Sequence, residues 1–422
     1  MVSTSPRFAI GTGRFEDRRL ASAVSEVSRA VNRSHIILSF NSGSSSDKFA
    51  LHRLSTDGEK LLAEGAAEGI GLGNGRLWIR DGGAKTLSDA ERSFPRSMDA
   101  LGALFDEMER LRLPRPDAIG HRVVHGGPNY FDPERVTPEL IEALRSLIPF
   151  APLHLPVEIE GIEALASRFP GVAQVVCFDT GFHRQMPEVA RRFALPRALW
   201  DEGICRYGFH GISYEYIMAT LGPAAPARIV IAHLGNGASM VAVQKGRPVD
   251  TTMGFTPTGG FMMGTRSGDL DPGLLVYLIN QKGYDGRRLE RVVNHESGLL
   301  GVSAISSDVK TLLAKRSAEP NAALAIEMFC YQMRKQIGAL AAVLGGLDLL
   351  VFTAGIGERA APVRFEVCRA LEYLGINLDR QRNEAHADQI SAPASPCTVR
   401  VIPTNEDLMI ARHTRRVIFG TV

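Results

Sequence analysis

Three short runs of apolar residues along this chain each lead into a turn rich in glycine and small polar residues. The runs with their turns span residues 36–46, 229–239 and 351–358. Continuous apolar runs of strand length that end in glycine predict buried β-strands. The first two align strand to strand and turn to turn at a separation of roughly half a chain. The pattern therefore predicts an α/β protein built by duplication.

Two longer segments carry apolar residues at the spacing of an α-helix. One runs from Met98 to Leu111 and the other from Ile326 to Leu344. This spacing places the apolar side chains on one face of each helix. We expect both faces to pack into the core and assign neither a cofactor.

The three glycine-rich turns also have a chemical meaning. Glycine lets backbone N–H groups approach phosphate oxygens closely, and serine and asparagine side chains add donors. One such turn is explained as well by an ordinary hairpin. Three such turns, each after an apolar strand, favour a polyphosphate ligand that is bound between the two halves of a duplicated protein.

Composition is that of an ordinary globular enzyme. The 422 residues are 45% hydrophobic with a formal net charge of +2, which predicts two or three domains and gives no indication of nucleic acid. No apolar stretch reads as a transmembrane helix, so no membrane partner is expected. The five cysteines are scattered without metal-ligand spacing, which indicates free thiols, a cytoplasmic location and no zinc site.

Residues 1–34 differ from the rest of the chain. They contain several arginines and lack strong apolar periodicity. We expect a disordered N-terminal extension, with an upstream start codon or an organelle transit peptide as alternatives. The folded core is expected to begin at His35.

Charged residues in apolar or glycine-rich company are the candidates for chemistry. Segments 120–127, 206–211 and 262–269 each place arginine or histidine beside glycines. The guanidinium of arginine offers a fixed fork of donors and a permanent charge, which suit the oxygens of a phosphoryl group. For an isolated arginine, a surface ion pair or a structural hydrogen bond is the commoner role.

Ten segments occur in the order and spacing of one family, and together they make the chain resemble the acetate kinases over nearly all of residues 35–420. The segments are 41–48, 120–127, 178–180, 206–211, 233–239, 253–272, 297–301, 306–308, 353–358 and 404–406. The resemblance implies an α/β fold of two duplicated actin-like ATPase (ribonuclease H-like) domains, with the active site in the cleft between them. Domain I is expected at 35–179 plus 406–422, and the nucleotide-binding domain II at 180–405.

The resemblance also assigns roles to individual residues. It implies a catalytic set and a pair of positions associated with Mg²⁺, for which Mn²⁺ is an alternative. The catalytic set is Arg122, Asp179, His210 and Arg266, and the metal-associated pair is Asn41 and Glu406. Magnesium accepts a few hard oxygen ligands together with water and phosphate, which suits that pair.

Further segments match the family's contacts to ATP or ADP and to the acetate methyl group. The nucleotide set is His233, Leu234, Gly235, Asn236, Gly237, Asp308, Val309, Lys310, Gly355, Ile356, Gly357, Glu358 and Arg359. Lys48 is added as a phosphate contact, with a structural role in its hairpin as the alternative. The substrate pocket is Arg122, Val124, Leu153, Phe209 and Pro257. His121 and His125 are left out, because hydrogen bonds to the neighbouring backbone are the simpler explanation for them.

The implied activity is reversible, Mg²⁺-dependent, in-line transfer of the ATP γ-phosphoryl group to acetate, giving acetyl phosphate and ADP. Acetate is ionised at neutral pH, because carboxylic acids titrate near pH 4, so the nucleophile needs no general base. We expect Asp179 to position the metal, its water or an arginine. Arg122, Arg266 and His210 are expected to offset charge on the moving phosphoryl group. Replacing either arginine by alanine is predicted to remove most of kcat and leave folding intact.

Alternatives to this activity remain open. A propionate kinase would use the same mechanism, and an ATP-driven clamp of the same superfamily would lack the carboxylate substrate. The resemblance further implies a homodimer.

The chain departs from the family pattern at several positions. Residues 155–158 replace the usual asparagines around Pro156, and Tyr214 replaces a usual histidine. Lys310 and Arg359 also differ, on segments expected to contact the nucleotide. These two changes predict a shift in phosphate-donor affinity or preference.

Overall fold

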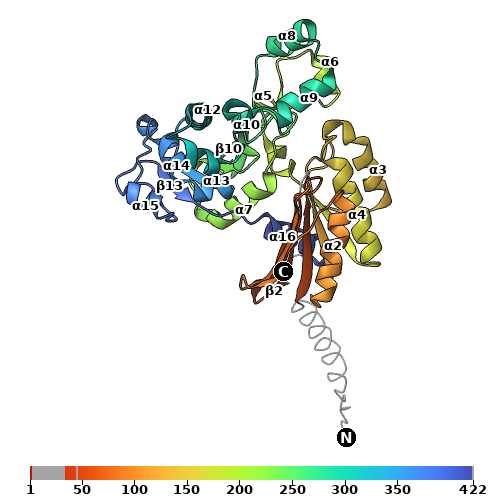
Figure 1. The fold of residues 1–422 in the computed structure, drawn as a ribbon. Helices are drawn as coiled ribbons and strands as arrows, with labels where there is room; N and C mark the ends of the chain where they lie inside the picture. Colours follow the sequence, from red (N-terminus) through yellow and green to blue (C-terminus); the bar gives the residue numbers. More distant parts are fainter. Residues whose placement is uncertain (2–33, 44–45, 421–422) are drawn as a thin grey trace.

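The computed structural model describes Met1 and residues 34–43 and 46–420, so residues 2–33 of the expected N-terminal extension lie outside the described residues. The chain forms two β-sheets (Figure 1). The first contains β1 (His35–Ser42), β2 (Ser46–Ser55), β3 (Gly58–Glu68), β4 (Arg76–Asp81), β5 (Thr86–Glu91), β6 (Ala118–Val123), β7 (Glu134–Arg135) and β8 (Ala173–Phe178). The second contains β9 (Arg228–Leu234), β10 (Ala238–Gln244), β11 (Arg247–Thr251), β12 (Leu349–Thr353) and β13 (Thr398–Val401).

The two sheets share one topology. The five-stranded order β3-β2-β1-β6-β8 in the first sheet corresponds to β11-β10-β9-β12-β13 in the second. In each, three strands form an antiparallel meander, and the last two run parallel to the first. Adjacent antiparallel strands need only tight turns, whereas parallel strands need helical crossovers. The expected duplication is therefore confirmed.

Helices cover both faces of the first sheet. One face carries α2 (Ser97–Arg110) and α4 (Leu155–Arg168), with α3 (Pro138–Ser146) packed on α4. The apolar stripe predicted for 98–111 is buried at Leu101, Leu104 and Phe105, although Met98 is exposed. The C-terminal helix α16 (Glu406–Phe419) packs against β1, β2, β6 and β8. Alternate β1 residues serve the two layers, because Leu38 clusters with α2 and Ile37 with α16.

The second sheet is covered in the same way. Helix α12 (Pro320–Leu344) buries the stripe predicted for 326–344 against β9, β10 and β11. Helix α7 (Gly211–Leu221) places Tyr214 and Ile217 in a separate cluster with Ile229 and Ile231 of β9. The chain leaves the first sheet after β8 and returns to it with α16. This packing supports dividing the chain after residues 179 and 405, which stays a prediction.

The remaining helices connect these layers. They are α5 (Glu188–Arg191), α6 (Arg197–Asp201), α8 (Pro272–Lys282), α9 (Gly286–His295), α10 (Gly298–Ser303), α11 (Val309–Lys315), α13 (Ala354–Arg359), α14 (Ala361–Cys368) and α15 (Arg380–Glu384), with 3₁₀ turns η1 (Ile148–Phe150), η2 (Gly181–Gln185), η3 (Gly222–Ala224) and η4 (Glu372–Leu374). None of the helices in the described ranges is long and apolar enough to cross a bilayer.

Candidate active site

The candidate site begins where parallel strands of the first sheet end. Arg122 is the penultimate residue of β6, and Asp179 directly follows the neighbouring strand β8. The carboxyl ends of parallel strands meet at one edge of a sheet, so these side chains come together. Arg122 Nη2 donates to Asp179 Oδ2 at 2.7 Å, and Nη1 donates to Asn41 Oδ1, at the end of β1, at 3.4 Å. Three residues distant in sequence thus form one polar cluster.

The charged groups in this cluster influence one another's pKa values strongly. Burial by itself would lower the pKa of Arg122, but the charges of Asp179, Glu406 and Glu158 outweigh it and raise that pKa above its usual value. Asp179 is fully buried, and its Oδ1 has no hydrogen-bond partner among the described residues. An acceptor oxygen buried without a partner is costly unless a ligand completes it. Asp179 therefore has one oxygen for the arginine and one left for a ligand.

His210 is held next to this cluster by its backbone. It precedes α7 with φ of 60°, a left-handed conformation that non-glycine residues adopt rarely. Its N–H donates to Asp179 Oδ2 at 3.0 Å, and the N–H of Gly211 donates to the Asp179 carbonyl at 2.8 Å. These two bonds hold the strained turn and tie His210 to the first sheet.

The surroundings of the His210 imidazole favour its uncharged form. Burial, and then the proximity of His233, Arg122 and Arg266, lower its pKa well below the usual value. Its ring stacks on that of His233, with centroids 4.1 Å apart, and its Nδ1 lies 2.8 Å from Ser239 Oγ. Nε2 is left for a ligand.

Arg266 differs from Arg122 in its surroundings. Its Nη1 donates to the Pro257 carbonyl at 3.2 Å, and among the described residues it forms no ion pair. Burial, and then the charge of Arg122, lower its pKa. A methyl group placed on Gly237 would lie 3.2 Å from Arg266 Nη1 and 3.5 Å from His210 Nε2. The two side chains therefore converge on the space above Gly237, which suits an anion.

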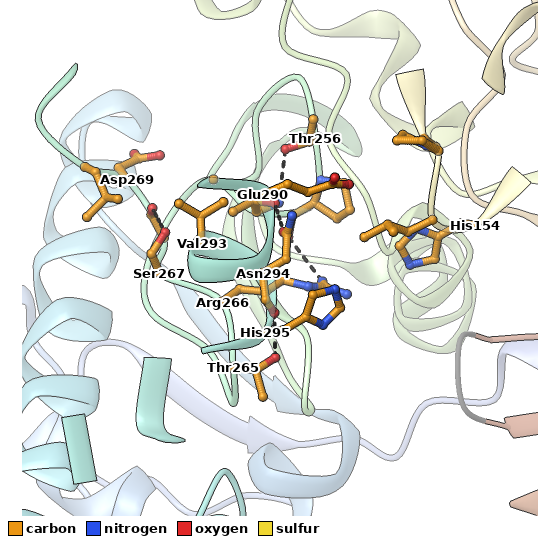
Figure 2. A pocket seen from close by; sticks show the side chains of 18 of the residues that line it. His154, Thr256, Thr265, Arg266, Ser267, Asp269, Glu290, Val293, Asn294 and His295 are labelled. Atoms are coloured by element: carbon orange, nitrogen blue, oxygen red, sulfur yellow. Dashed lines mark hydrogen bonds between the residues drawn. The ribbon is translucent and has the colours of Figure 1, made fainter. Parts of the chain in front are cut away.

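A cavity of about 720 Å³ opens beside Arg266 and is lined from both halves of the molecule. Figure 2 shows Arg266, Asn294 and His295 on one side of it and His154 on the other. Leu153 and Pro257 of the expected substrate pocket, and Asn236 of the nucleotide set, line this cavity.

Three members of the expected substrate pocket, Arg122, Val124 and Phe209, do not line this cavity. Val124 and Phe209 are buried in the main hydrophobic cluster and are not among the residues described as lining the cavity. The backbone N–H of Val124 donates to both carboxyl oxygens of Glu158, at 3.2 and 3.1 Å. The structure therefore brings only part of the expected pocket to an open surface.

The glycine-rich turns of the second sheet lie at one sheet edge. They follow β9 and β12, which are parallel neighbours in which His233 pairs with Thr353. A methyl group on Gly235 would come within 4.0 Å of the Ala354 side chain, so the two turns are adjacent. Gly355 and Arg359 are exposed there, and Ile356 is half-buried.

Other side chains in the expected nucleotide set have structural partners. Leu234 and Val309 are buried in the core, which leaves only their backbone for a nucleotide. Asp308 caps α11 by accepting from the N–H groups of Lys310 and Thr311, and Lys310 itself is exposed. Glu358 Oε1 accepts from the Thr404 N–H at 3.2 Å, beside Glu406.

A buried arginine supports the Gly355 turn from inside. Arg364 Nη1 donates to the carbonyls of Gly357 and Glu358, each at 2.8 Å, and Nε donates to Asn383 Oδ1 at 2.8 Å. The side chain is fully buried. Its hydrogen bonds hold the end of α13 in place while the exposed face of the turn stays open.

The site contains hard oxygen donors suited to a magnesium ion. Asp179 Oδ1 has no partner, Asn41 Oδ1 has one long contact, and burial raises the pKa of Glu406 to about 7. Lys48 pairs with Asn41 in the β1–β2 register and is exposed. Within the described ranges no group of three or more His, Cys, Asp or Glu residues is arranged to hold a metal. Magnesium needs no such cage, because it keeps waters and phosphate oxygens as ligands.

The sequence pattern missed several groups that contact the site. Ser239 and Tyr214 lie behind His210, and Glu158 lies behind Val124. Only the departures from the family at 155–158 and at Tyr214 pointed to two of them. His125 Nδ1 accepts from the backbone N–H of Gly127, as expected, whereas His121 bonds to the side chain of the distant Gln174 and not to neighbouring backbone.

Comparisons with known proteins agree with this geometry. The family model described as the acetokinase family matches residues 36–412. An acetate kinase of Rhodopseudomonas palustris strain TIE-1 is 46% identical over 398 residues, covering 92% of this chain and 99% of that protein. The crystal structure of Porphyromonas gingivalis acetate kinase superposes with a TM-score of 0.81 at 37% identity, covering 91% of this chain and all of that one. A Francisella tularensis propionate kinase gives a TM-score of 0.84 at 35% identity with the same coverage.

Proposed function

The chain belongs to the acetokinase family, and we propose that it reversibly transfers the γ-phosphoryl group of ATP to acetate, giving acetyl phosphate and ADP. The fold expected for it, two duplicated actin-like ATPase domains, is confirmed by the repeated sheet topology and by the structural neighbours. The observation that carries the proposal is the convergence of His210 and the unpaired cation Arg266 beside the Arg122–Asp179 pair.

The reaction requires correct positioning of the reactants and stabilisation of negative charge, and it requires no proton transfer. A carboxylate oxygen of acetate attacks the γ-phosphorus, and the bond from that phosphorus to the β–γ bridging oxygen breaks, leaving ADP. No proton moves in this step, because acetate is already ionised at neutral pH. The in-line displacement spreads negative charge over the equatorial phosphoryl oxygens.

The arginines have different tasks in this scheme. Arg266 has no carboxylate partner among the described residues, so its full charge is available to the phosphoryl group. Arg122 is paired with Asp179, which fixes its guanidinium and lowers the net charge that it offers. His210 is uncharged and suited to act as a hydrogen-bond donor at Nε2. Fixed donors of this kind stabilise charge that develops in a transition state.

Magnesium fits the oxygen donors at the edge of the first sheet. Asp179 and Glu406 would hold it directly or through water, with Asn41 beside them, and Mn²⁺ is the alternative ion. Bound there, the ion supplies positive charge that orients the phosphates and offsets their charge. Glu406 begins α16, so the start of that helix belongs to the same site.

For the nucleotide we propose the edge of the second sheet. The turns after β9 and β12 are adjacent, and Gly355 and Arg359 are exposed there. Backbone N–H groups of such turns bind phosphate well. The N-cap at Asp308 and the exposed Lys310 start α11 in the same half of the chain. Lys48 stays a proposed phosphate contact on the opposite half.

The acceptor pocket is proposed at Leu153 and Pro257, which line the cavity beside Arg266. Propionate is the second candidate substrate, since a structural neighbour is a propionate kinase. One methylene in an apolar pocket changes the transition-state free energy by only about 1–3 kcal/mol. Acetate and propionate are therefore both expected as substrates, with acetate the better one.

The test is hydroxylamine trapping of acyl phosphate formed from ATP with acetate, propionate and butyrate, each with Mg²⁺ and with EDTA. We expect Mg²⁺-dependent product, most from acetate. If propionate gave the most product, the preferred substrate would be propionate and the proposed activity would be that of a propionate kinase. ATP hydrolysis that is indifferent to all three acids would refute the acyl kinase and favour an ATP-driven clamp.

A homodimer is proposed from the surface of α8. This helix buries none of its residues, and Leu274, Val276, Tyr277 and Ile279 are each about half exposed. Figure 1 shows α8 and α9 projecting beyond the rest of the second half. An apolar surface of this kind commonly marks an interface. Light scattering after gel filtration should give a dimer for the wild type and a monomer for Tyr277→Glu, and a monomeric wild type would refute it.

We also propose a cytoplasmic location. All five cysteines are buried and unpaired in the described chain. Free thiols persist in reducing compartments.

A further inference from the structure

A chain of three hydroxyl and imidazole groups lies behind the catalytic face of His210. His210 Nδ1 is 2.8 Å from Ser239 Oγ, and that oxygen is 2.5 Å from the phenol oxygen of Tyr214. Ser239 is on β10 and Tyr214 is on α7, so tertiary packing brings the groups together. Tyr214 and Ser239 are fully buried. The direction of these hydrogen bonds determines which nitrogen of His210 carries the proton.

The phenol sets that direction. Tyr214 stays protonated, because burial raises its pKa above the usual value. Within the described part of the chain its hydroxyl has one hydrogen-bond partner, Ser239 Oγ. Were Ser239 to donate to the phenol oxygen, the phenol hydrogen would be buried without an acceptor, which is unfavourable. Tyr214 therefore donates to Ser239, and the serine hydrogen is free to point at His210 Nδ1.

This hydrogen-bond direction determines the protonation of Nε2, on the opposite side of the imidazole. A neutral imidazole carries one N–H, so an Nδ1 that accepts leaves the proton on Nε2. Nε2 lies 3.5 Å from the position that a methyl group on Gly237 would occupy, and Arg266 Nη1 lies 3.2 Å from the same position. In the opposite tautomer an Nε2 lone pair would face the anion in that space and repel it.

We infer that Tyr214, acting through Ser239, is a positioning residue that holds His210 in the tautomer with its proton on Nε2, facing the transferred phosphoryl group. The phosphoryl part of this inference rests on the proposed function, whereas the tautomer does not. The family resemblance leads one to expect histidine at this position, so the phenol is a feature of this chain.

The decisive measurement is the protonation state of the His210 ring nitrogens in the free wild-type enzyme. Long-range proton–nitrogen correlation spectra distinguish a protonated from a bare ring nitrogen, and the His210→Asn variant assigns the signals. We expect Nε2 protonated and Nδ1 bare. A wild-type spectrum with the proton on Nδ1 would overturn the inference, whatever the enzyme proves to catalyse.

Variants test the role of the phenol. Tyr214→Phe should give a mixture of tautomers and lower kcat about tenfold, with KM values for acetate and ATP within about twofold of the wild type. This loss is smaller than the roughly 10²–10³-fold expected when a whole transition-state donor is removed. Should Tyr214→Phe not fold, Ser239→Ala removes a single hydroxyl and provides the same two readouts.

Tyr216→Phe is the matched control. It removes a phenol hydroxyl from the same helix, from a half-buried ring that contacts Arg412 and not the site. We expect it to keep the wild-type spectrum and kcat. Equal loss of kcat in both tyrosine variants, or an unchanged spectrum and kcat in Tyr214→Phe, would contradict a positioning role for Tyr214.

Discussion

Replacing Gly237 by alanine places a methyl group close to both of the groups proposed to hold the phosphoryl group. The new carbon would lie 3.2 Å from Arg266 Nη1 and 3.5 Å from His210 Nε2. Ordinary van der Waals contacts are 3.4–4 Å, so the guanidinium must shift by a few tenths of an ångström. Gly237 does not have a positive φ, and alanine therefore fits its backbone. The change acts on the site and leaves the fold intact.

The expected loss of kcat/KM in Gly237→Ala is large because the reaction rate depends strongly on the geometry at the reacting centre. A misplacement of about 1 Å can cost about 10²-fold in rate. The methyl group also occupies space in which a phosphoryl oxygen is proposed to lie. We expect kcat/KM for acetate to fall by about 10- to 100-fold in the hydroxylamine assay, with Tm changed by no more than about 2 °C, because glycine-to-alanine changes at compatible positions alter stability by less than about 1 kcal/mol.

Gly102→Ala is the matched control. Gly102 is in α2, and a methyl group there would meet nothing within 4 Å. Its variant should keep the wild-type kcat, with Tm equal or higher, because alanine favours a helix over glycine by about 1 kcal/mol. A Gly237→Ala enzyme with kcat/KM within about twofold of the wild type would refute the placement of the phosphoryl group above Gly237.

Three further predictions follow from the charges of the site. Arg266→Ala should lower kcat by about 10³- to 10⁵-fold with little change in Tm, because Arg266 has no ion-pair partner among the described residues; near-normal turnover would exclude its role. Arg122→Ala should lower kcat and also destabilise the fold by about 3–5 kcal/mol, because Asp179 loses its partner. This loss of stability is contrary to the expectation from sequence. Denaturant unfolding measures the loss, and an unchanged unfolding midpoint would contradict it. Burial raises the pKa of Glu158 from 4.5 to about 8 despite the charge of Arg122. Between these two pKa values the folded state retains a proton that the unfolded state releases, so the free energy of unfolding falls as pH rises from about 4.5 to about 8. Glu158→Gln should flatten the fall in Tm between about pH 5 and pH 8, and a variant as pH-dependent as the wild type would argue against this assignment.

Much of the fold follows from local pattern. Apolar runs that end in glycine turns predicted β1, β9 and β12, and helical spacing predicted α2 and α12. These features are readable because strand and helix periodicities depend on neighbouring residues. The duplication was also readable, since the two copies keep the same strand and turn pattern. Arg122 and Arg266 stood out because charge amid apolar and glycine-rich sequence is rare, whereas Asp179 was named only through the family resemblance.

Other features were decided only by tertiary structure. The sequence marked two arginines alike, yet one is paired with a buried carboxylate and the other is not. Leu234 and Val309 lie within matching motifs but are buried in the core, and Asp308 is a helix cap.

The contacts behind His210 show the same limit. Tyr214 and Ser239 meet because α7 packs on the sheet that contains β10, a relation that no local pattern encodes. Hydrogen-bond partners and desolvation depend on which distant elements cover a side chain. The sequence by itself therefore determined the duplicated fold and predicted which residues carry the chemistry, and the packing of the two halves decided their charge, their partners and their protonation.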